Sequence, residues 1–594
     1  MNWHRASQMP SSPAPASLLP RPLKAAVTLV AFLLATFSGF AAANVARNVF
    51  ESPTDPVAVT PIDQAVFAQL KSLGLTPTRS SDAVFVRRVY LDVLGVLPTA
   101  AEARAFLLDT DIQNKRRLLI DQLLEREEFA TYWAMKWSDL LRIKAEFPVN
   151  LWPNAAQAYH RWVLASLTAN KPYDQFAREL LTASGSNFRV GPANFYRAIQ
   201  NRKPDGIATA VALTLMGTRA ETWPAERLAG MAVFFSQVGF KPTSEWKEEH
   251  VFWDPLGTST AAGNTAPGRA AVTAIGTTPP PAPATPAPSA AAPTPRALAA
   301  TFPDGTKLTI PPDRDPRELF ADWLISPQNP WFTRNIANRV WSWLVGRGII
   351  HEADDIRPDN PPSNPTLLAY LEKELIASRY DLKHLYRLIL NSQTYQFSPV
   401  PPSTRPEAAA NFASYPLRRL EAEVLIDTTN RITGTTDLYT SPIPEPFTYI
   451  PEDKPAVAIA DGSITSPFLA LFGRSARATG MENERDNKPV PAQWLHLLNS
   501  SHIQRKLEQG PKLRAVLEKA RPAAATVEEL YLTVLSRFPT PAELKAALAY
   551  GQVVPARPAK ANNPATKASV QKRREDWVDL AWSLLNSSEF LYRH

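Results

Sequence analysis

The sequence contains no cysteine in its 594 residues. Without a thiol the chain cannot form a disulfide, a thioether bond to haem or a covalent thiol intermediate. A thiol enzyme and a covalent haem carrier are therefore excluded, and stability has to come from core packing. The 15 tryptophans and the 45% of hydrophobic residues are enough to build sizeable cores.

Acidic residues are absent from the first 43 positions. Arg5, Arg21 and Lys24 precede an apolar run at 25–37, and small residues end at Ala41–Ala43. This layout is typical of a secretory signal with an A-x-A cleavage site. The apolar run is shorter than the ~20 residues that span a bilayer. We therefore predict that residues 1–43 are a cleaved signal peptide and that the protein is exported to the periplasm or cell envelope. An uncleaved N-terminal anchor is the alternative, and no later segment is apolar enough to cross a membrane.

A concentrated block of positive charge is also lacking. Without residues 1–43 the chain has 61 basic and 56 acidic residues, a net charge of +5 that is spread along its length. No basic run is interleaved with aromatic residues, so nucleic acid is not an expected partner.

Helical periodicity dominates both sides of a low-complexity stretch. Thr99 and Glu102 form a capping box, and the leucines that follow recur at helical spacing. The segment 278–295 is almost wholly Pro, Ala, Thr and Ser, which stays extended because it has nothing to bury. The sequence predicts a mainly α protein with two helical domains, 60–255 and 301–594, joined by a Pro/Ala-rich disordered linker at 256–300. The turn signal Asp304-Gly305 predicts a short β-hairpin at 301–310.

Two distant segments resemble each other. Residues 90–107 (YLDVLGVLPTAAEARAFL) and 531–548 (YLTVLSRFPTPAELKAAL) are identical at ten of eighteen positions. Both predict a helix, a Pro-Thr break and a capped second helix. We interpret the pair as a duplicated helical unit.

Several motifs together identify a family. In the first half they are Arg87-Arg88-Val89-Tyr90-Leu91-Asp92, Lys136-Trp137-Ser138-Asp139 and Asn170-Lys171-Pro172-Tyr173-Asp174. In the second half they are Phe320-Ala321-Asp322-Trp323-Leu324, Asn338-Arg339-Val340-Trp341, Tyr415-Pro416-Leu417-Arg418-Arg419-Leu420 and Leu585-Asn586-Ser587-Ser588-Glu589-Phe590. The first set resembles the planctomycete cytochrome-like (PSCyt type) domain of unknown function, and the second resembles its planctomycete-specific C-terminal (PSD type) companion.

The resemblance implies export, a pairing of the two domains and no established activity. Many relatives occur beside sulfatase-like proteins and in polysaccharide-rich lifestyles, and many have a Cys-x-x-Cys-His motif after a Gly-x-Arg. Here Gly217-Thr218-Arg219 is followed by Ala220-Glu221-Thr222-Trp223-Pro224, which has no cysteine and no histidine. We therefore expect no haem cofactor. His160, beside Tyr159 and Trp162, is interpreted as a core residue, and no histidine cluster predicts a metal site.

The densest group of polar residues lies at 461–502. Arginine binds carboxylate, sulfate or phosphate with two parallel hydrogen bonds, and a pair of carboxyl groups can perform glycosidic acid–base chemistry. The predicted ligand-binding residues are Asp461, Arg474, Arg477, Glu482, Glu484 and His496. The alternative is that the same residues form a buried ion-pair network that holds a long loop against helices.

No nucleophile or phosphate-loop motif fixes a reaction. The first interpretation is a non-enzymatic cell-envelope protein that binds a partner protein or a glycan. The second is a hydrolase that acts on an anionic polysaccharide, with its site at 461–502. The third is a degenerate cytochrome-like electron carrier, which the absence of cysteine disfavours.

Overall fold

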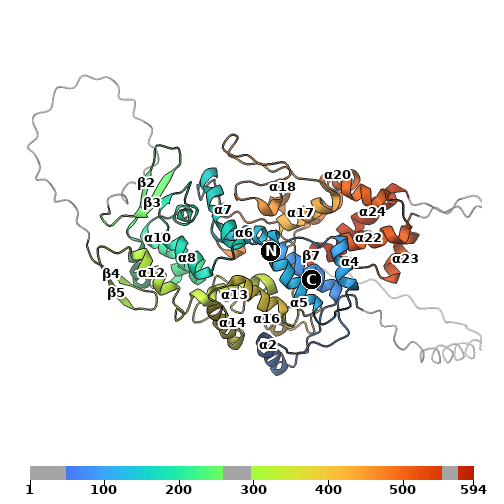
Figure 1. Ribbon diagram of the computed structural model, residues 1–594, viewed down its shortest axis with the longest axis horizontal. Helices are drawn as coiled ribbons and strands as arrows, with labels where there is room; N and C mark the ends of the chain where they lie inside the picture. The colour runs from blue at the N-terminus through green and yellow to red at the C-terminus, as the bar shows by residue number, and fades with distance from the viewer. Residues whose placement is uncertain (1–47, 258–295, 552–572) are drawn as a thin grey trace, which may run out of the picture. The chain divides into compact units, whose positions relative to one another are not determined.

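The computed structural model describes residues 48–257, 296–551 and 573–594, and Phe50–His594 form one compact unit (Figure 1). Helices account for most of it. Those before residue 257 are α2 (Pro61–Ser72), α3 (Asp82–Leu94), α4 (Ala100–Leu108), α5 (Lys115–Leu124), α6 (Glu127–Leu140), α7 (Pro153–Thr168), α8 (Tyr173–Thr182), α9 (Asn194–Arg197), α10 (Pro204–Val211) and α11 (Ala225–Ala232). Those after residue 296 are α12 (Pro316–Leu324), α13 (Phe332–Val345), α14 (Pro365–Ala377), α15 (Leu382–Asn391), α16 (Pro406–Ala410), α17 (Ala422–Thr433), α18 (Pro467–Leu471), α19 (Pro491–Asn499), α20 (Ser501–Gln509), α21 (Pro511–Glu518), α22 (Ala523–Leu535), α23 (Pro541–Ala549), α24 (Arg574–Leu585) and α25 (Ser588–Leu591). The predicted mainly α class is confirmed.

The strands form three small antiparallel sheets. β4 (Leu298–Thr301) pairs with β5 (Lys307–Ile310) around Asp304-Gly305, which confirms the predicted hairpin. A three-stranded sheet contains β1 (Gly185–Ser186), β3 (Glu249–Trp253) and β2 (Val238–Pro242) in that order, and β6 (Arg418–Arg419) pairs with β7 (Tyr592–Arg593). β2 and β3 lie within the segment 60–255 that the sequence predicts as a helical domain, so helices do not account for the whole of that segment. Their pairing is favourable only once the chain has folded, and Pro242 weakens the local strand signal.

The core is aromatic where α6 meets helices from the second half of the chain. Trp133 of α6 lies 5.3 Å, centroid to centroid, from Trp343 of α13 and 4.6 Å from Tyr386 of α15. All three side chains are buried. Large aromatic rings bury much apolar area each, so these contacts fix α6 against α13 and α15.

The two similar segments have the same local structure. α3 and α22 end at Gly95 and Ser536, both with left-handed backbone (φ 65° and 60°). The helices that follow each begin with a capping box, in which Thr99 pairs with Glu102 and Thr540 with Glu543. The predicted helix–break–helix units are confirmed, and α22 packs on α4, as Figure 1 shows in orange and blue.

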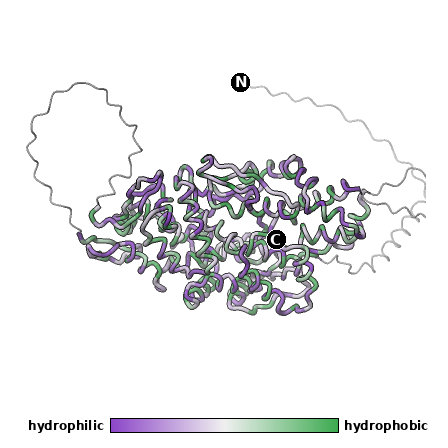
Figure 2. The backbone as a smooth tube through the Cα atoms, turned by 45° about the horizontal axis from the view of Figure 1, so that its top comes forward, coloured by the Kyte–Doolittle hydropathy of each residue, from purple (hydrophilic) through white to green (hydrophobic). Residues whose placement is uncertain are grey.

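Two predictions fall outside the described residues: the signal peptide at 1–43 and nearly all of the linker at 256–300. The division into two domains stays a prediction. Helices from either side of the linker pack together, as α2 on α14, α5 on α15 and α8 on α12. Figure 2 shows hydrophobic and hydrophilic residues interspersed along the described chain. None of the helices in this part has the length and hydrophobicity needed to span a bilayer.

Candidate functional site

Asp461 and Arg477 hold the polar loop against the end of α6. The buried Arg477 guanidinium donates to Asp139 Oδ1 at 2.9 Å and to the carbonyl oxygen of Ala460 at 2.7 Å. The Asp461 carboxylate accepts the backbone N–H of Ala145 at 2.8 Å. Both predicted site residues therefore bind protein groups across more than 300 positions of sequence.

Arg474 and Glu484 are engaged in the same way. Arg474 Nε donates to Glu423 Oε1 at 3.3 Å, and its Nη1 donates to the carbonyl oxygen of Ile464. The Glu484 carboxylate accepts the backbone N–H groups of Ala478 at 2.8 Å and Thr479 at 3.2 Å. These contacts fit the alternative of a loop-holding network.

His496 lies on α19 in a separate group. Its Nε2 is 3.3 Å from His502 Nδ1, and His502 Nε2 is 2.7 Å from Asp437 Oδ1. His496 does not line the cavity that Glu482 lines.

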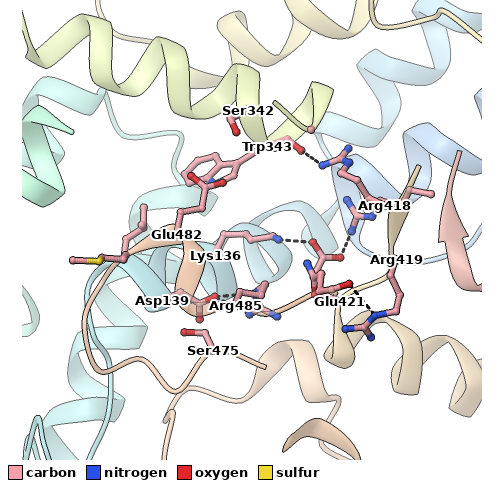
Figure 3. Close-up of a pocket in the computed structure, with 15 residues that line it drawn as sticks. Lys136, Asp139, Ser342, Trp343, Arg418, Arg419, Glu421, Ser475, Glu482 and Arg485 are labelled. Carbon is pink, nitrogen blue, oxygen red and sulfur yellow. Dashed lines mark hydrogen bonds and ion pairs between the residues drawn. The ribbon is translucent and has the colours of Figure 1, made fainter. Parts of the chain in front are cut away.

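Glu482 lines a cavity of about 200 Å³, which we term the charged cavity (Figure 3). Five basic and three acidic side chains line it: Lys136, Arg418, Arg419, Arg485 and Arg593 with Asp139, Glu421 and Glu482. Ser342, Trp343 and Ser475 complete much of the wall. The sequence prediction therefore located one residue of the charged cavity and missed most of the others.

The secondary structure explains how distant residues meet there. Lys136 and Asp139 are one turn apart on α6, so they share a helix face. The β6–β7 pairing places Arg418 directly opposite Arg593. The charged cavity thus combines α6 from the first half of the chain with β6 and the 475–487 loop from the second half.

Glu421 is a carboxylate of the charged cavity that pairs with two of its basic residues. Lys136 Nζ and Arg593 Nη2 each form an ion pair with its carboxylate, and Arg419, the last residue of β6, lies two positions before it. Burial alone would raise the pKa of Glu421, but the charges of Arg593 and Lys136 outweigh it and hold the pKa well below the usual range. Glu421 is therefore an ionised anchor and not a proton donor.

Arg485 also lines the charged cavity and lies between two carboxylates. Its Nη2 lies 2.7 Å from Asp139 Oδ2, and its Nη1 lies 2.6 Å from Glu423 Oε2. Burial opposes ionisation of Glu423, yet Arg485 and then Arg474 outweigh it and lower its pKa to about 2. Asp139 and Glu423 together accept four hydrogen bonds from the five N–H groups of Arg485.

Glu482 differs from these acids because none of the basic groups that the structure describes lies within close hydrogen-bond distance of its carboxylate. Arg339 Nη1 is 3.8 Å from Glu482 Oε2, and Arg339 itself binds Asp354 at 2.7 Å. Burial raises the pKa of Glu482 to about 7, with Arg339 opposing the shift and Asp354 adding to it. The side chain, one-third exposed, can gain or lose a proton near neutral pH.

Lys136 has hydrogen-bond capacity left over, and so have Arg418 Nε, Arg419 Nη1 and Arg593 Nε, which are buried and have no partner among the described residues. An ammonium has three N–H donors, and Glu421 is its one acceptor among the described residues. The terminal nitrogens of Arg418 donate to the carbonyl oxygens of Trp343 and Leu344, both at 2.9 Å. An anion that entered the charged cavity would therefore find unused N–H donors at Lys136.

Asp92 supports the wall behind the charged cavity. Its buried carboxylate accepts hydrogen bonds from Tyr395 at 2.9 Å, Tyr415 at 2.8 Å and Arg593 at 2.8 Å. Asp92, Lys136, Asp139, Tyr415 and Arg418 all belong to the motifs that carried the family resemblance. Those motifs could have pointed to this site, because the structure brings them together around one cavity.

The residues at the cytochrome-like position do not fit a covalently attached haem. Ala220 is buried, the Thr222 hydroxyl donates to the carbonyl oxygen of Arg219 at 2.8 Å, and no cysteine exists in the chain. His160 is buried on α7, where burial lowers its pKa to about 3, and its Nε2 has no partner within the described segments. The described residues also contain no group of three or more histidine or acidic side chains that could hold a metal ion.

Comparison with known proteins gives two family matches. Residues 61–222 match PSCyt2, a protein of unknown function (DUF1549), and residues 316–551 match PSD1, a protein of unknown function (DUF1553). Searches of curated proteins and of solved structures found no match. The charged cavity draws Lys136 and Asp139 from the first match and Arg418, Glu421 and Glu482 from the second. The chain therefore contains a PSCyt2 domain at 61–222 and a PSD1 domain at 316–551.

Proposed function

We propose that this chain is an exported, non-enzymatic protein of the cell envelope that binds an acidic glycan. The carboxylate or sulfate group of a sugar occupies the charged cavity and takes its hydrogen bonds from Lys136. The acid-free N-terminal stretch with its apolar run supports export. N-terminal sequencing of the mature protein should begin near Asn44, and an intact Met1 in the cytoplasm would contradict export.

The observation that carries the proposal is the charge balance around Lys136. Five basic side chains face three acidic ones, a net charge of +2 when all are ionised. Protonation of Glu482, whose pKa is raised to about 7 by burial, makes the balance more positive. Such a lining attracts an anion in a partly desolvated space, where ionic hydrogen bonds are strong.

The size of the charged cavity limits what enters. About 200 Å³ is below the roughly 300–1,000 Å³ of common small-molecule pockets. It accommodates one charged group with part of the ring that bears it. A polar, concave site of this kind suits a glycan substituent better than the flat apolar surface of a protein partner.

Thermal stabilisation by galacturonate, with neutral galactose as the control ligand, tests the proposal. A ligand that binds the native state stabilises it by about 2.7 kcal/mol at a hundredfold excess over its Kd. We expect stabilisation by galacturonate, none by galactose, and its loss in Lys136→Met. Lys383→Met is the matched control, because Lys383 forms an ion pair with Glu125 away from the charged cavity.

Equal stabilisation by the two sugars, or an unchanged galacturonate effect in Lys136→Met, would contradict the proposal. A lower melting temperature in Lys136→Met without any ligand effect in the parent protein would instead assign Lys136 to the structural network.

A hydrolase of anionic polysaccharide is the second candidate, favoured by one observation. Two kinds of carboxyl group line the same cavity: Glu482, with a pKa near 7, and Glu421, held ionised by Arg593 and Lys136. Separated pKa values are what an acid and its ionised partner require. Glu482→Gln should leave galacturonate binding intact in a binder. In a hydrolase it should abolish release of reducing ends from polygalacturonate.

A further inference from the structure

A second cavity of about 620 Å³ shares no lining residue with the charged cavity. Its lining includes Thr218, Trp223, Arg227, Trp331, Arg334 and Asp359, and we term it the indole pocket. Trp223 and Arg227 flank the start of α11, while Trp331 and Arg334 flank the start of α13. Its volume is within the usual range for ligand pockets.

Arg227 fixes the two indole rings. The centre of its guanidinium lies 4.1 Å from the centroid of Trp223 and 5.5 Å from that of Trp331. Its Nε donates to the carbonyl oxygen of Pro303 at 2.8 Å, which anchors the group to the β4–β5 hairpin. Both indoles are half-buried, and their N–H groups have no acceptor in the described part of the chain. Beside the surface that Arg227 covers, the two rings offer partly exposed apolar area and two unused donors.

Positive charge predominates at the rim. Arg334 is 40% exposed and uses Nε to bind Glu372 at 2.7 Å. Its two terminal nitrogens have no acceptor among the described residues, so they can form a two-pronged contact with a ligand. Arg357 lies 3.4 Å from Asp359, the one acidic residue of the lining.

The backbone around the indole pocket argues against a phosphate ligand. Five prolines line it: Pro224, Pro330, Pro358, Pro361 and Pro362. Proline has no backbone N–H, whereas nucleotide phosphates are commonly held by successive backbone N–H groups. Arginine side chains are therefore the groups that would bind an anion here, and the indoles provide the apolar surface.

We propose that the indole pocket is a second ligand site, which takes a sugar ring that carries a carboxylate or sulfate. The apolar face of the ring packs on the indoles of Trp223 and Trp331. The charged substituent binds the terminal nitrogens of Arg334, and Asp359 accepts hydroxyl groups. This site does not rest on the function proposed for the charged cavity.

Calorimetric titration of the full chain tests this site in a Lys136→Met background, which disables the charged cavity. The probes are trigalacturonate, the neutral maltotriose of equal length, and adenosine monophosphate. We expect trigalacturonate to bind, and Trp331→Ala, Trp223→Ala or Arg334→Gln to weaken it by about tenfold or more. Trp246→Ala and Arg314→Gln are matched controls, since both residues are exposed and lie outside the lining.

The proposal would be overturned if maltotriose bound as tightly as trigalacturonate, if adenosine monophosphate bound more tightly, or if Arg334→Gln left the affinity for trigalacturonate unchanged. Arg334→Gln replaces a half-exposed side chain, so it keeps the test decisive if a tryptophan variant fails to fold. Trigalacturonate binding that appears only when Lys136 is intact would assign all binding to the charged cavity and also overturn the proposal.

Discussion

The charged cavity and the indole pocket differ in how far their residues are committed to the fold. Around the charged cavity, Arg485, Arg593 and Glu421 are buried or nearly so, and each bonds two or more protein groups. At the indole pocket, Trp223, Trp331 and Arg334 are half-exposed and retain unused donors. Polar groups around the charged cavity therefore have two roles, because they stabilise the fold and would also bind a ligand. Those of the indole pocket can bind a ligand with little loss of folding free energy.

The difference predicts that removing one carboxylate lowers stability far more in the first region than in the second. Glu423 is fully buried between Arg474 and Arg485, so Glu423→Gln leaves two buried guanidinium groups short of an anion. Breaking a buried pair costs about 3–5 kcal/mol. Glu372→Gln, which frees the half-exposed Arg334, should cost under about 1 kcal/mol. Urea unfolding measures both, and equal costs would remove the contrast between the two regions.

Acid should weaken the ion pairs that Glu423 forms with Arg474 and Arg485. The pKa of Glu423 is lowered from 4.5 to about 2, because Arg485 and Arg474 outweigh the effect of burial. Its contribution is fully present above the unfolded pKa and is lost as pH falls from 4.5 towards 2. At about 1.4 kcal/mol per pKa unit this amounts to about 3 kcal/mol. Between pH 4.5 and 2 the free energy of unfolding should fall less steeply in Glu423→Gln than in the parent protein. The same steepness in both proteins would show that Glu423 does not cause the loss of stability in acid.

Binding in the charged cavity should depend on pH through Glu482. The groups that face it are Arg339 of α13, Asp354, Lys136 of α6 and Arg418 of β6. Ionisation above the pKa of about 7 adds a negative charge, so galacturonate affinity should fall by up to about tenfold as pH rises through 7. Titrations on either side of this value check the effect. Glu482→Gln should bind equally at both, and a persistent slope in that variant would point to another group.

The last prediction is an absence of haem absorbance. Covalent attachment needs two thiols, and the chain has none. We expect no Soret absorbance after expression through an export pathway with haem-attachment machinery. A stoichiometric Soret band that disappeared in His160→Ala would restore the electron-carrier interpretation.

Local features were predictable from the sequence because their causes are local. The Thr99–Glu102 capping box and the Asp304-Gly305 hairpin depend on residues within a few positions of each other. β2 and β3 were missed because the pairing of short strands depends on the assembled chain.

The candidate sites were predicted only in part for the same reason. Charge density drew attention to 461–502, but the partners of Arg477 and Arg485 lie on α6 and α17, far away in sequence. Lys136 and Asp139 share a helix face, yet the sequence does not say that this face meets a cavity. The sequence does not predict the indole pocket, because Trp223 and Trp331 are ordinary core candidates until the fold places both in the lining of one cavity.

The most direct test of the central claim locates an anion in the charged cavity. Crystals grown with selenate, a sulfate analogue, should give an anomalous peak within hydrogen-bond distance of Lys136 Nζ. The peak should persist in Lys383→Met and vanish in Lys136→Met. A charged cavity without a peak, while selenate occupies only exposed arginines elsewhere, would contradict the claim that this region binds anions.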